Sequence, residues 1–292
     1  MASQIPSRRQ ILSRTAAAGA ALAALPALAA LLADSSSRWF KVGVCEWNLG
    51  RNDPSSYDLA KEIGVDGIQV NMGSVKNDMH LRKPDVQQAY LAAAKKHGLE
   101  VASIGVAEMN NVPLKSDPRA EPWLEESIAV ARGLGVKVIL LAFFGKNDLK
   151  NDKAGTERVI ELLKVAGPKA EKAGVVYGIE SWLSAEEHMH IIDRVASPAL
   201  QVYYDVGNSH LKGYDIYKEI RWLGAKNICE FHAKDYEFIF GKGKVDFVEV
   251  RRAMDDIGWH GWIQIEGQQP LGMVESYRQD RAYLKQVFPP KV

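Results

Sequence analysis

The feature that most constrains this chain is a repeated alternation of a short apolar run, a polar turn and a helix-forming segment. The alternation begins near Arg38 and recurs eight times, and no linker or low-complexity segment divides it. The apolar runs are rich in Val, Ile and Leu, which is typical of parallel strands covered on both faces. The expected strands are residues 41–46, 67–71, 100–105, 138–144, 175–180, 200–205, 228–232 and 262–266.

Helix signals fill the intervals between these runs. Asp53 is predicted to cap the first helix, with Pro54 as its first residue and Gly64 at its end. The sequence Ser-Ala-Glu-Glu at 184–187 is close to a capping box and predicts a helix start. The remaining helices are expected over residues 83–97, 121–134, 156–172, 184–195, 215–223, 247–257 and 276–287.

Eight such units in about 255 residues match the size of one (β/α)8 TIM barrel of the α/β class. The alternation alone also permits a doubly wound open sheet. No glycine-rich dinucleotide fingerprint follows any of the runs, which argues against a nucleotide-binding sheet. We therefore predict a single-domain barrel spanning residues 38–292.

The first 33 residues differ from the rest. Ser7, Arg8 and Arg9 precede Gln-Ile-Leu, and an Ala/Leu-rich stretch with a small-residue site at 27–29 follows. This arrangement resembles a twin-arginine (Tat) export signal. We expect residues 1–33 to be a Tat-type signal peptide and the barrel to be exported to the periplasm or another extracytoplasmic space. A retained membrane anchor is the alternative, and no second span follows, so cleavage would leave no stable membrane span.

The last four apolar runs, which follow one another along the chain, each end in an ionisable residue. The four residues are Glu180, Asp205, His232 and Glu266, and consecutive members are 25, 27 and 34 residues apart. Each interval is close to the length of one β/α unit, so the four would stand at the carboxyl ends of successive strands. In a barrel these ends converge on the face where active sites form.

Such a cluster predicts a metal site. Three carboxylates in one place repel each other unless some are protonated or a cation neutralises them. One imidazole with three carboxylates is a hard ligand set that favours Mn²⁺ or Mg²⁺, with Co²⁺ or Zn²⁺ as alternatives. One bound ion would act as a Lewis acid, and ligand carboxylates could move a proton. Taken singly, each residue could equally be a solvated cap or a core histidine, and their shared spacing favours ligation.

Several motifs are similar to those of one known superfamily. They are Gly-Val-Asp-Gly-Ile at 64–68, Asp-Val-Gly-Asn at 205–208, His-Ala-Lys-Asp at 232–235, Gly-Lys-Val-Asp-Phe at 243–247 and Gly-Trp-Ile-Gln-Ile-Glu at 261–266. On these motifs the chain resembles the xylose isomerase-like barrel superfamily, in its sugar phosphate isomerase/epimerase branch. The resemblance extends over nearly all of the chain after the signal segment.

The resemblance implies roles for individual residues. Glu180 and Glu266 would be metal ligands and also the acid/base pair, one on each side of the substrate carbon. Lys234 and Asn208 would contact substrate hydroxyls, whereas a surface charge and a turn residue are their plain alternatives. Two departures affect the acid/base assignment. Many family members carry Glu where this chain has Gln69, and epimerases often carry His at the position of Asn208.

Two further residues are candidates for substrate binding. His210 lies two residues beyond Asn208 and could substitute for the missing histidine, although a surface histidine is the alternative. Trp47 follows the first strand, where sugar rings stack on aromatic side chains and barrel cores also use them. The expected partner is a small carbohydrate, and the sequence leaves a homo-oligomer open.

The leading hypothesis is a metal-dependent isomerase or epimerase of a sugar, keto-sugar or cyclitol, working through an enediolate-type intermediate. A lyase or dehydratase could use the same metal and proton abstraction, and a non-catalytic sugar-binding barrel is the third reading. Export argues against a phosphorylated substrate. The net charge of +1 and the Asn at 208 argue against nucleic acid as a partner, although a DNA-repair branch shares the fold.

Overall fold

The computed structural model describes residues 39–289. The predicted signal peptide, with its paired arginines and the alternative of a retained anchor, lies outside the described residues. Residues 40–289 belong to one compact unit. Among the helices of residues 39–289, none is long and apolar enough to cross a membrane.

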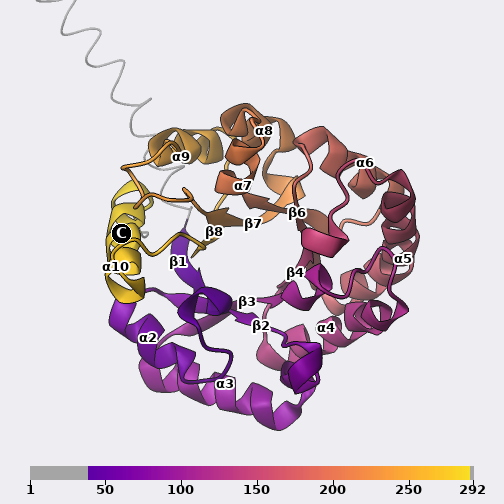
Figure 1. Ribbon diagram of the computed structural model, residues 1–292, viewed down its shortest axis with the longest axis horizontal. Helices are drawn as coiled ribbons and strands as arrows, with labels where there is room; N and C mark the ends of the chain where they lie inside the picture. The colour runs from indigo at the N-terminus through magenta and orange to yellow at the C-terminus, as the bar shows by residue number, and fades with distance from the viewer. Residues whose placement is uncertain (1–38, 290–292) are drawn as a thin grey trace, which may run out of the picture. The chain divides into compact units, whose positions relative to one another are not determined.

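Eight parallel strands form a closed ring in which each strand pairs with the next one along the chain (Figure 1). The ring closes where the first strand pairs with the last, from Phe40 opposite Gly261 to Val44 opposite Ile265. The predicted (β/α)8 TIM barrel is therefore confirmed, and an open sheet is excluded. The strands are β1 Phe40–Cys45, β2 Gly67–Asn71, β3 Glu100–Val106, β4 Val138–Phe143, β5 Val176–Ser181, β6 Leu200–Asp205, β7 Ile228–Ala233 and β8 Gly261–Ile265.

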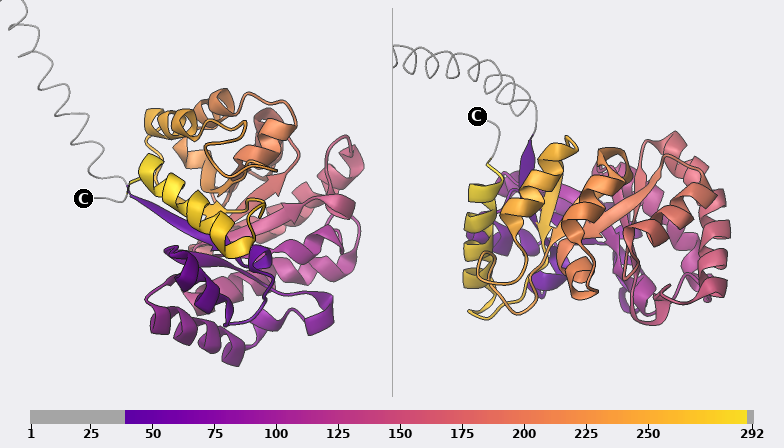
Figure 2. Two further views of the ribbon diagram at one scale, coloured as in Figure 1. Left: turned by 60° about the vertical axis from the view of Figure 1, so that its left-hand side comes forward. Right: turned by 90° about the horizontal axis from the view of Figure 1, so that it is seen from above.

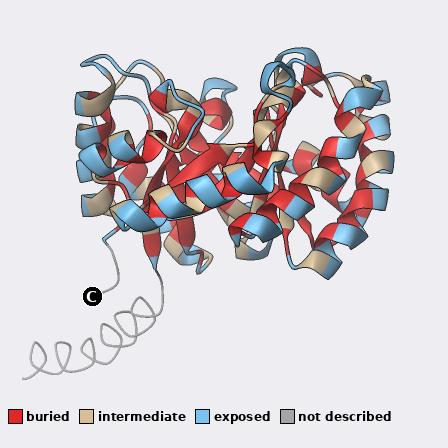
Figure 3. Cartoon of the chain, turned by 90° about the horizontal axis from the view of Figure 1, so that it is seen from below, coloured by how far each residue is buried: buried red, intermediate tan, exposed pale blue. Residues whose placement is uncertain are grey.

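Helices surround the ring, with buried inner faces and exposed outer faces (Figure 3). The last of them, α10, lies beside β1 and α2 (Figure 2), and Phe288 contacts Phe40 with ring centroids 5.4 Å apart. The helices are α2 Ser56–Ile63, α3 Pro84–His97, α4 Glu121–Leu134, α5 Lys153–Ala173, α6 Ala185–Val195, α7 Val206–Leu211, α8 Ile216–Leu223, α9 Phe247–Asp256 and α10 Met273–Val287.

Short 3-10 helices line the connections, and several follow the carboxyl end of a strand. They are η1 Glu46–Leu49, η2 Val75–Asn77, η3 His80–Arg82, η4 Ala107–Asn110, η5 Pro118–Ala120, η6 Gly145–Asn147 and η7 Ala225–Asn227.

Local sequence accounts for most helix ends. The Ser184 side chain accepts a hydrogen bond from the Glu187 amide while the Glu187 side chain accepts one from the Ser184 amide, so the predicted capping box is present. The predicted Asp53 cap is wrong: α2 begins at Ser56. The Asp53 carboxylate instead accepts a hydrogen bond from the Ser55 amide at 2.8 Å, which closes a turn ahead of the helix.

The floor of the barrel contains one buried carboxylate. Glu230 points inward from β7, and its Oε2 accepts hydrogen bonds from Ser103 Oγ at 2.8 Å and Tyr203 Oη at 3.0 Å. The Gln264 amide donates to the same oxygen at 3.4 Å. These partners come from β3, β6 and β8, so the carboxylate of Glu230 links four strands.

A candidate metal centre at the carboxyl ends of the strands

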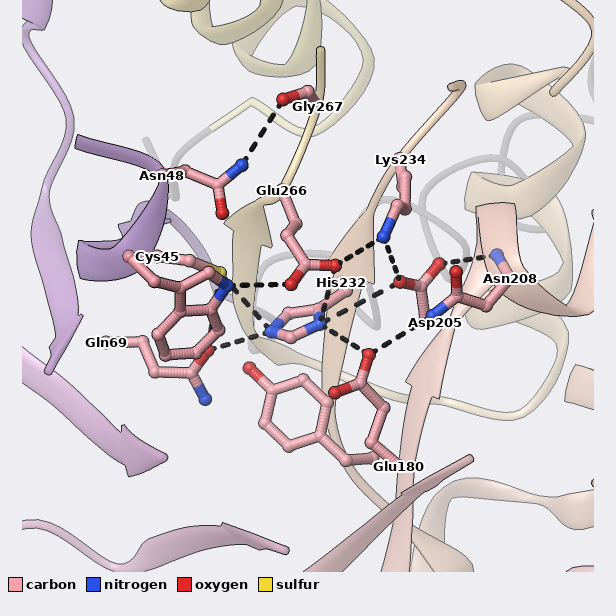
Figure 4. A network of polar contacts seen from close by, with 12 residues as sticks. Cys45, Asn48, Gln69, Glu180, Asp205, Asn208, His232, Lys234, Glu266 and Gly267 are labelled. Carbon is pink, nitrogen blue, oxygen red and sulfur yellow. Dashed lines mark hydrogen bonds and ion pairs between the residues drawn. The ribbon is translucent and has the colours of Figure 1, made fainter. Parts of the chain in front are cut away.

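The four predicted ligands meet at one end of the barrel (Figure 4). Glu180, Asp205 and His232 close β5, β6 and β7, and Glu266 directly follows β8. Each offers one ligand atom, and these atoms all lie within 4.8 Å of one another. The four residues, which the sequence spaces one to a strand, thus form a compact cluster.

The His232 ring has two different sides. Its Nδ1 lies 2.9 Å from Glu180 Oε1, 3.6 Å from Glu266 Oε2 and 3.9 Å from Asp205 Oδ2. Its Nε2 lies 2.8 Å from the amide oxygen of Gln69, which can only accept a hydrogen bond. The ring therefore carries a proton on Nε2, and Nδ1 is directed at the carboxylates, as in metal-binding histidines held by an outer partner.

The pKa of His232 reflects the groups that surround its ring. Burial lowers the pKa of His232, but neighbouring negative groups, among them Glu180 and Glu266, outweigh it and raise the pKa well above its ordinary value. Cys45 lies 3.4 Å from Nε2, and burial raises the pKa of its thiol to about 12. The thiol therefore stays neutral near pH 7, which leaves the carboxylates near Nδ1 as the negative groups beside the ring.

Asp205 provides the test of whether a cation fits. Its Oδ1 accepts a hydrogen bond from the Asn208 amide at 2.8 Å, which caps α7. Its Oδ2 is buried and accepts no hydrogen bond from residues 39–289. Burial raises the pKa of Asp205 to about 8. A buried carboxylate oxygen without a partner is costly, and a cation bound at the centre would supply the missing partner. The residues therefore fit a divalent ion.

Glu266 is held by two donors. Lys234 Nζ lies 2.8 Å from its Oε2, and Trp47 Nε1 donates to its Oε1 at 2.8 Å. Burial raises the pKa of Glu266, but the positive charges of Lys234 and His232 overcome this and lower it to about 2. Lys234 also lies 3.8 Å from Asp205 Oδ2. Glu266 is thus an ionised carboxylate with a fixed orientation.

Glu180 accepts a hydrogen bond from the side-chain amide of Asn208, and Tyr236 fixes the orientation of that amide. Asn208 Nδ2 donates to Glu180 Oε1 at 3.4 Å, and Tyr236 Oη donates to Asn208 Oδ1 at 2.8 Å. The backbone of Tyr236 has φ of 45°, a conformation that side-chain-bearing residues rarely adopt. Two hydrogen bonds thus connect Tyr236, at a strained loop position, through Asn208 to the predicted catalytic carboxylate of Glu180.

The structure separates His210 from the other predicted substrate-binding residues. Lys234, Asn208 and Trp47 all hydrogen-bond to a member of the cluster. His210 instead lines a separate hollow of about 330 Å³ with Asp235 and Lys244 among its neighbours. No hydrogen bond joins it to the cluster within residues 39–289.

Sequence reasoning missed the roles of Gln69, Cys45 and Tyr236. In the sequence, Gln69 stands out only as a departure from the family pattern. Cys45 is the last residue of β1 and pairs in register with Gln69 in the middle of β2, and the Cys45 thiol lies 3.4 Å from Gln69 Oε1. The available signal was a polar side chain inside an apolar strand, which points into the barrel beside the ligands.

Comparisons with known proteins agree with this architecture. The model of the xylose isomerase-like TIM barrel family matches residues 57–287. Over 176 residues the chain is 26% identical to a 2-epi-5-epi-valiolone 7-phosphate 2-epimerase of Actinoplanes sp., covering 60% of this chain and 65% of that protein, just under two thirds. Over 256 residues it is 27% identical to SgbU of Escherichia coli, to which L-ribulose-5-phosphate 3-epimerase activity is assigned, covering 77% and 88%.

A solved structure of an L-ribulose 3-epimerase superposes with a TM-score of 0.70 at 17% identity. The superposition covers 85% of this chain and 94% of that one. At this identity the likeness extends to the fold alone.

Proposed function

Because this chain belongs to the xylose isomerase-like TIM barrel family, we propose that it is a divalent-metal-dependent isomerase or epimerase of a sugar, keto-sugar or cyclitol. The names of the two curated relatives, both epimerases, support this reaction class. One observation carries the proposal: the buried Oδ2 of Asp205, which accepts no hydrogen bond from residues 39–289, lies beside Nδ1 of His232 and the two glutamates, all within 4.8 Å.

The proposed ligands are Glu180, Asp205, His232 and Glu266. Their oxygen-rich set favours Mn²⁺ or Mg²⁺, with Co²⁺ or Zn²⁺ as alternatives. When bound, the ion supplies Lewis acidity, which polarises a substrate carbonyl and stabilises the negative charge that develops beside it.

The two glutamates are the proposed proton carriers. Glu180 reaches the cluster from β5 and Glu266 from β8, with β6 and β7 between them, so they can flank one substrate carbon. The glutamate that is ionised would remove the proton beside the carbonyl, become a carboxylic acid and leave an enediolate. The other glutamate would return a proton from the opposite side only in its protonated form, and would become a carboxylate. Return to the same carbon gives the epimer, and return to the neighbouring carbon gives the isomer.

Asn208 and Lys234 would support this exchange. The Asn208 amide donates to Glu180 and so holds its carboxyl group in a fixed direction. The Lys234 ammonium beside Glu266 would balance negative charge on the substrate oxygens.

The same ammonium favours one second candidate, a lyase or dehydratase. Loss of a hydroxyl adjacent to the enediolate needs an acid near the departing oxygen, and Lys234 Nζ lies 2.8 Å from the carboxylate of Glu266. Product analysis separates the two reactions, because elimination removes water and epimerisation preserves the formula. A non-catalytic sugar-binding barrel would yield neither product.

The test combines metal analysis with hydrogen exchange. Protein purified without chelator should contain about one divalent ion per chain, and His232→Ala should lose it. The matched control is His190→Ala, which alters an exposed histidine of α6. Metal-loaded protein incubated in D₂O with free keto-sugars should place deuterium beside the carbonyl, whereas Glu180→Gln should not. Wild type and His232→Ala that are equally free of metal, even after addition of Mn²⁺, would overturn the proposal.

A further inference from the structure

The cluster is open to solvent on one side only. The side chains of His232, Asp205 and Glu180 are at most 4% exposed, whereas those of Glu266 and Lys234 are 14% and 17% exposed. A substrate must therefore approach over Glu266 and Lys234.

A hollow of about 770 Å³ adjoins this opening. Gly267, which follows Glu266, and Tyr236, which bonds to Asn208, form part of its wall. Asn48 lies above Glu266 on the same side of the cluster as Lys234 (Figure 4). This volume is within the usual range of a ligand site and leaves room for more of the substrate than its reacting carbons.

Acceptor oxygens outnumber free donors among the side chains that line this hollow. Asn48 Nδ2 donates to Tyr277 Oη at 3.0 Å, and Gln269 Nε2 donates to the Asn48 carbonyl at 2.8 Å and to Tyr277 Oη at 2.9 Å. Both amide nitrogens are thus engaged, and the amide oxygens take up no hydrogen bond from residues 39–289. The exposed side chains of Gln268 and Glu237 add an amide and a carboxylate.

No Lys, Arg or His side chain lines this hollow in the described part of the chain. The neighbouring Lys234 is paired with Glu266 and Asp205. A phosphate group would meet acceptor oxygens and a carboxylate there, with no cation to pair with it. Hydroxyl groups would find the acceptors that they need.

We propose that this hollow binds an uncharged, hydroxyl-bearing remainder of the substrate, so that the protein selects unphosphorylated sugars. The inference rests on the proposed function for the identity of the reacting end. It departs from the sugar phosphates for which the two curated relatives are named.

The test measures binding of matched ligand pairs by calorimetry to the Mn²⁺-loaded protein. The pairs are D-ribulose with D-ribulose 5-phosphate and D-fructose with D-fructose 6-phosphate. At least one neutral sugar should bind about tenfold more tightly than its phosphate. Gln268→Lys, which places a cation in the hollow, should reduce that preference severalfold. Gln88→Lys is the matched control, because Gln88 is exposed on α3.

The outcomes separate this inference from the proposed reaction. Equal or tighter binding of the phosphates to wild type, or no binding of any sugar, overturns it. The same holds if the two lysine variants behave alike. If neutral sugars bind as expected but no deuterium is exchanged and no new sugar forms, the selectivity stands and the proposed reaction fails.

Discussion

At the scale of single residues, the site depends on side chains that fix the direction of other side chains. Gln69 decides which nitrogen of His232 faces the carboxylates, and Tyr236 decides which end of the Asn208 amide faces Glu180. Neither Gln69 nor Tyr236 is itself a predicted metal ligand. Their effect on chemistry is indirect and therefore separable by experiment.

Gln69→Leu should weaken metal binding while the barrel remains folded. The variant removes the acceptor of the Nε2 proton, so the ring is no longer held with Nδ1 toward the carboxylates. Loss of such an outer partner typically costs 10- to 100-fold in metal affinity. Titration with Zn²⁺ measures the affinity, and ¹⁵N NMR of the histidine measures the tautomer. Gln69→Glu keeps an acceptor and should retain both, and equal affinities for Leu, Glu and wild type would refute the role.

Tyr236→Phe should lower kcat/KM by about tenfold without changing metal content. The hydroxyl that orients the Asn208 amide is lost, while the four proposed ligands are untouched. Steady-state kinetics with metal analysis of the same samples tests this. Tyr283→Phe is the control, because the Tyr283 hydroxyl makes no hydrogen bond within residues 39–289. A parallel loss of metal would assign Tyr236 to metal binding instead.

At the scale of elements, the sequence was most informative where apolar runs meet a polar residue. The strand ends at Glu180, Asp205 and His232 could be placed within one residue, because burial of parallel strands leaves a clear hydrophobic signal. The helix α7 was not predicted. It is six residues long and depends on the Asp205 cap and on Gly207, where a Cβ would lie 2.6 Å from the Lys234 carbonyl oxygen. Contacts of this kind join distant segments and leave no periodic pattern.

One tertiary contact of an element should be visible as pH-dependent stability. Asp280 on α10 accepts a hydrogen bond from the Phe240 amide at 2.8 Å, which anchors the β7–α9 loop. Its other carboxylate oxygen is buried and has no partner among the described residues. Burial raises the pKa of Asp280 to about 7. The folded protein therefore retains a proton between about pH 4 and pH 7 that the unfolded chain has released.

The free energy of unfolding should accordingly fall as the pH rises from 4 to 7, by at most about 1.4 kcal/mol per pH unit from this group. Asp280→Asn should remove that part of the slope, as measured by urea unfolding across this range. Asp193→Asn, at an exposed position of α6, is the control. Identical slopes for wild type and Asp280→Asn would show that Asp280 ionises normally.

At the scale of the whole molecule, the proposed ligands lie at the carboxyl ends of β5 to β8, while three of the residues that contact them come from the opposite part of the ring. Cys45 ends β1, Trp47 follows it in η1, and Gln69 lies on β2. A cation bound by the cluster would therefore stabilise contacts across the entire ring. At a metal concentration 100 times the Kd, binding adds about 2.7 kcal/mol to the free energy of unfolding. Removal with EDTA should lower Tm by several degrees, and Mn²⁺ should restore it. His232→Ala should unfold at the same temperature with and without EDTA, and a chelator-sensitive variant would place the metal elsewhere.

The pairing of β1 with β8 has a consequence for the order of assembly. Glu266 directly follows the last strand to leave the ribosome, and its orienting partner Trp47 follows the first. The cluster therefore stays incomplete until synthesis of the barrel is finished and the two strands have met. A molecule in which β1 and β8 have not paired lacks the Trp47–Glu266 contact, so the complete cluster requires a closed ring.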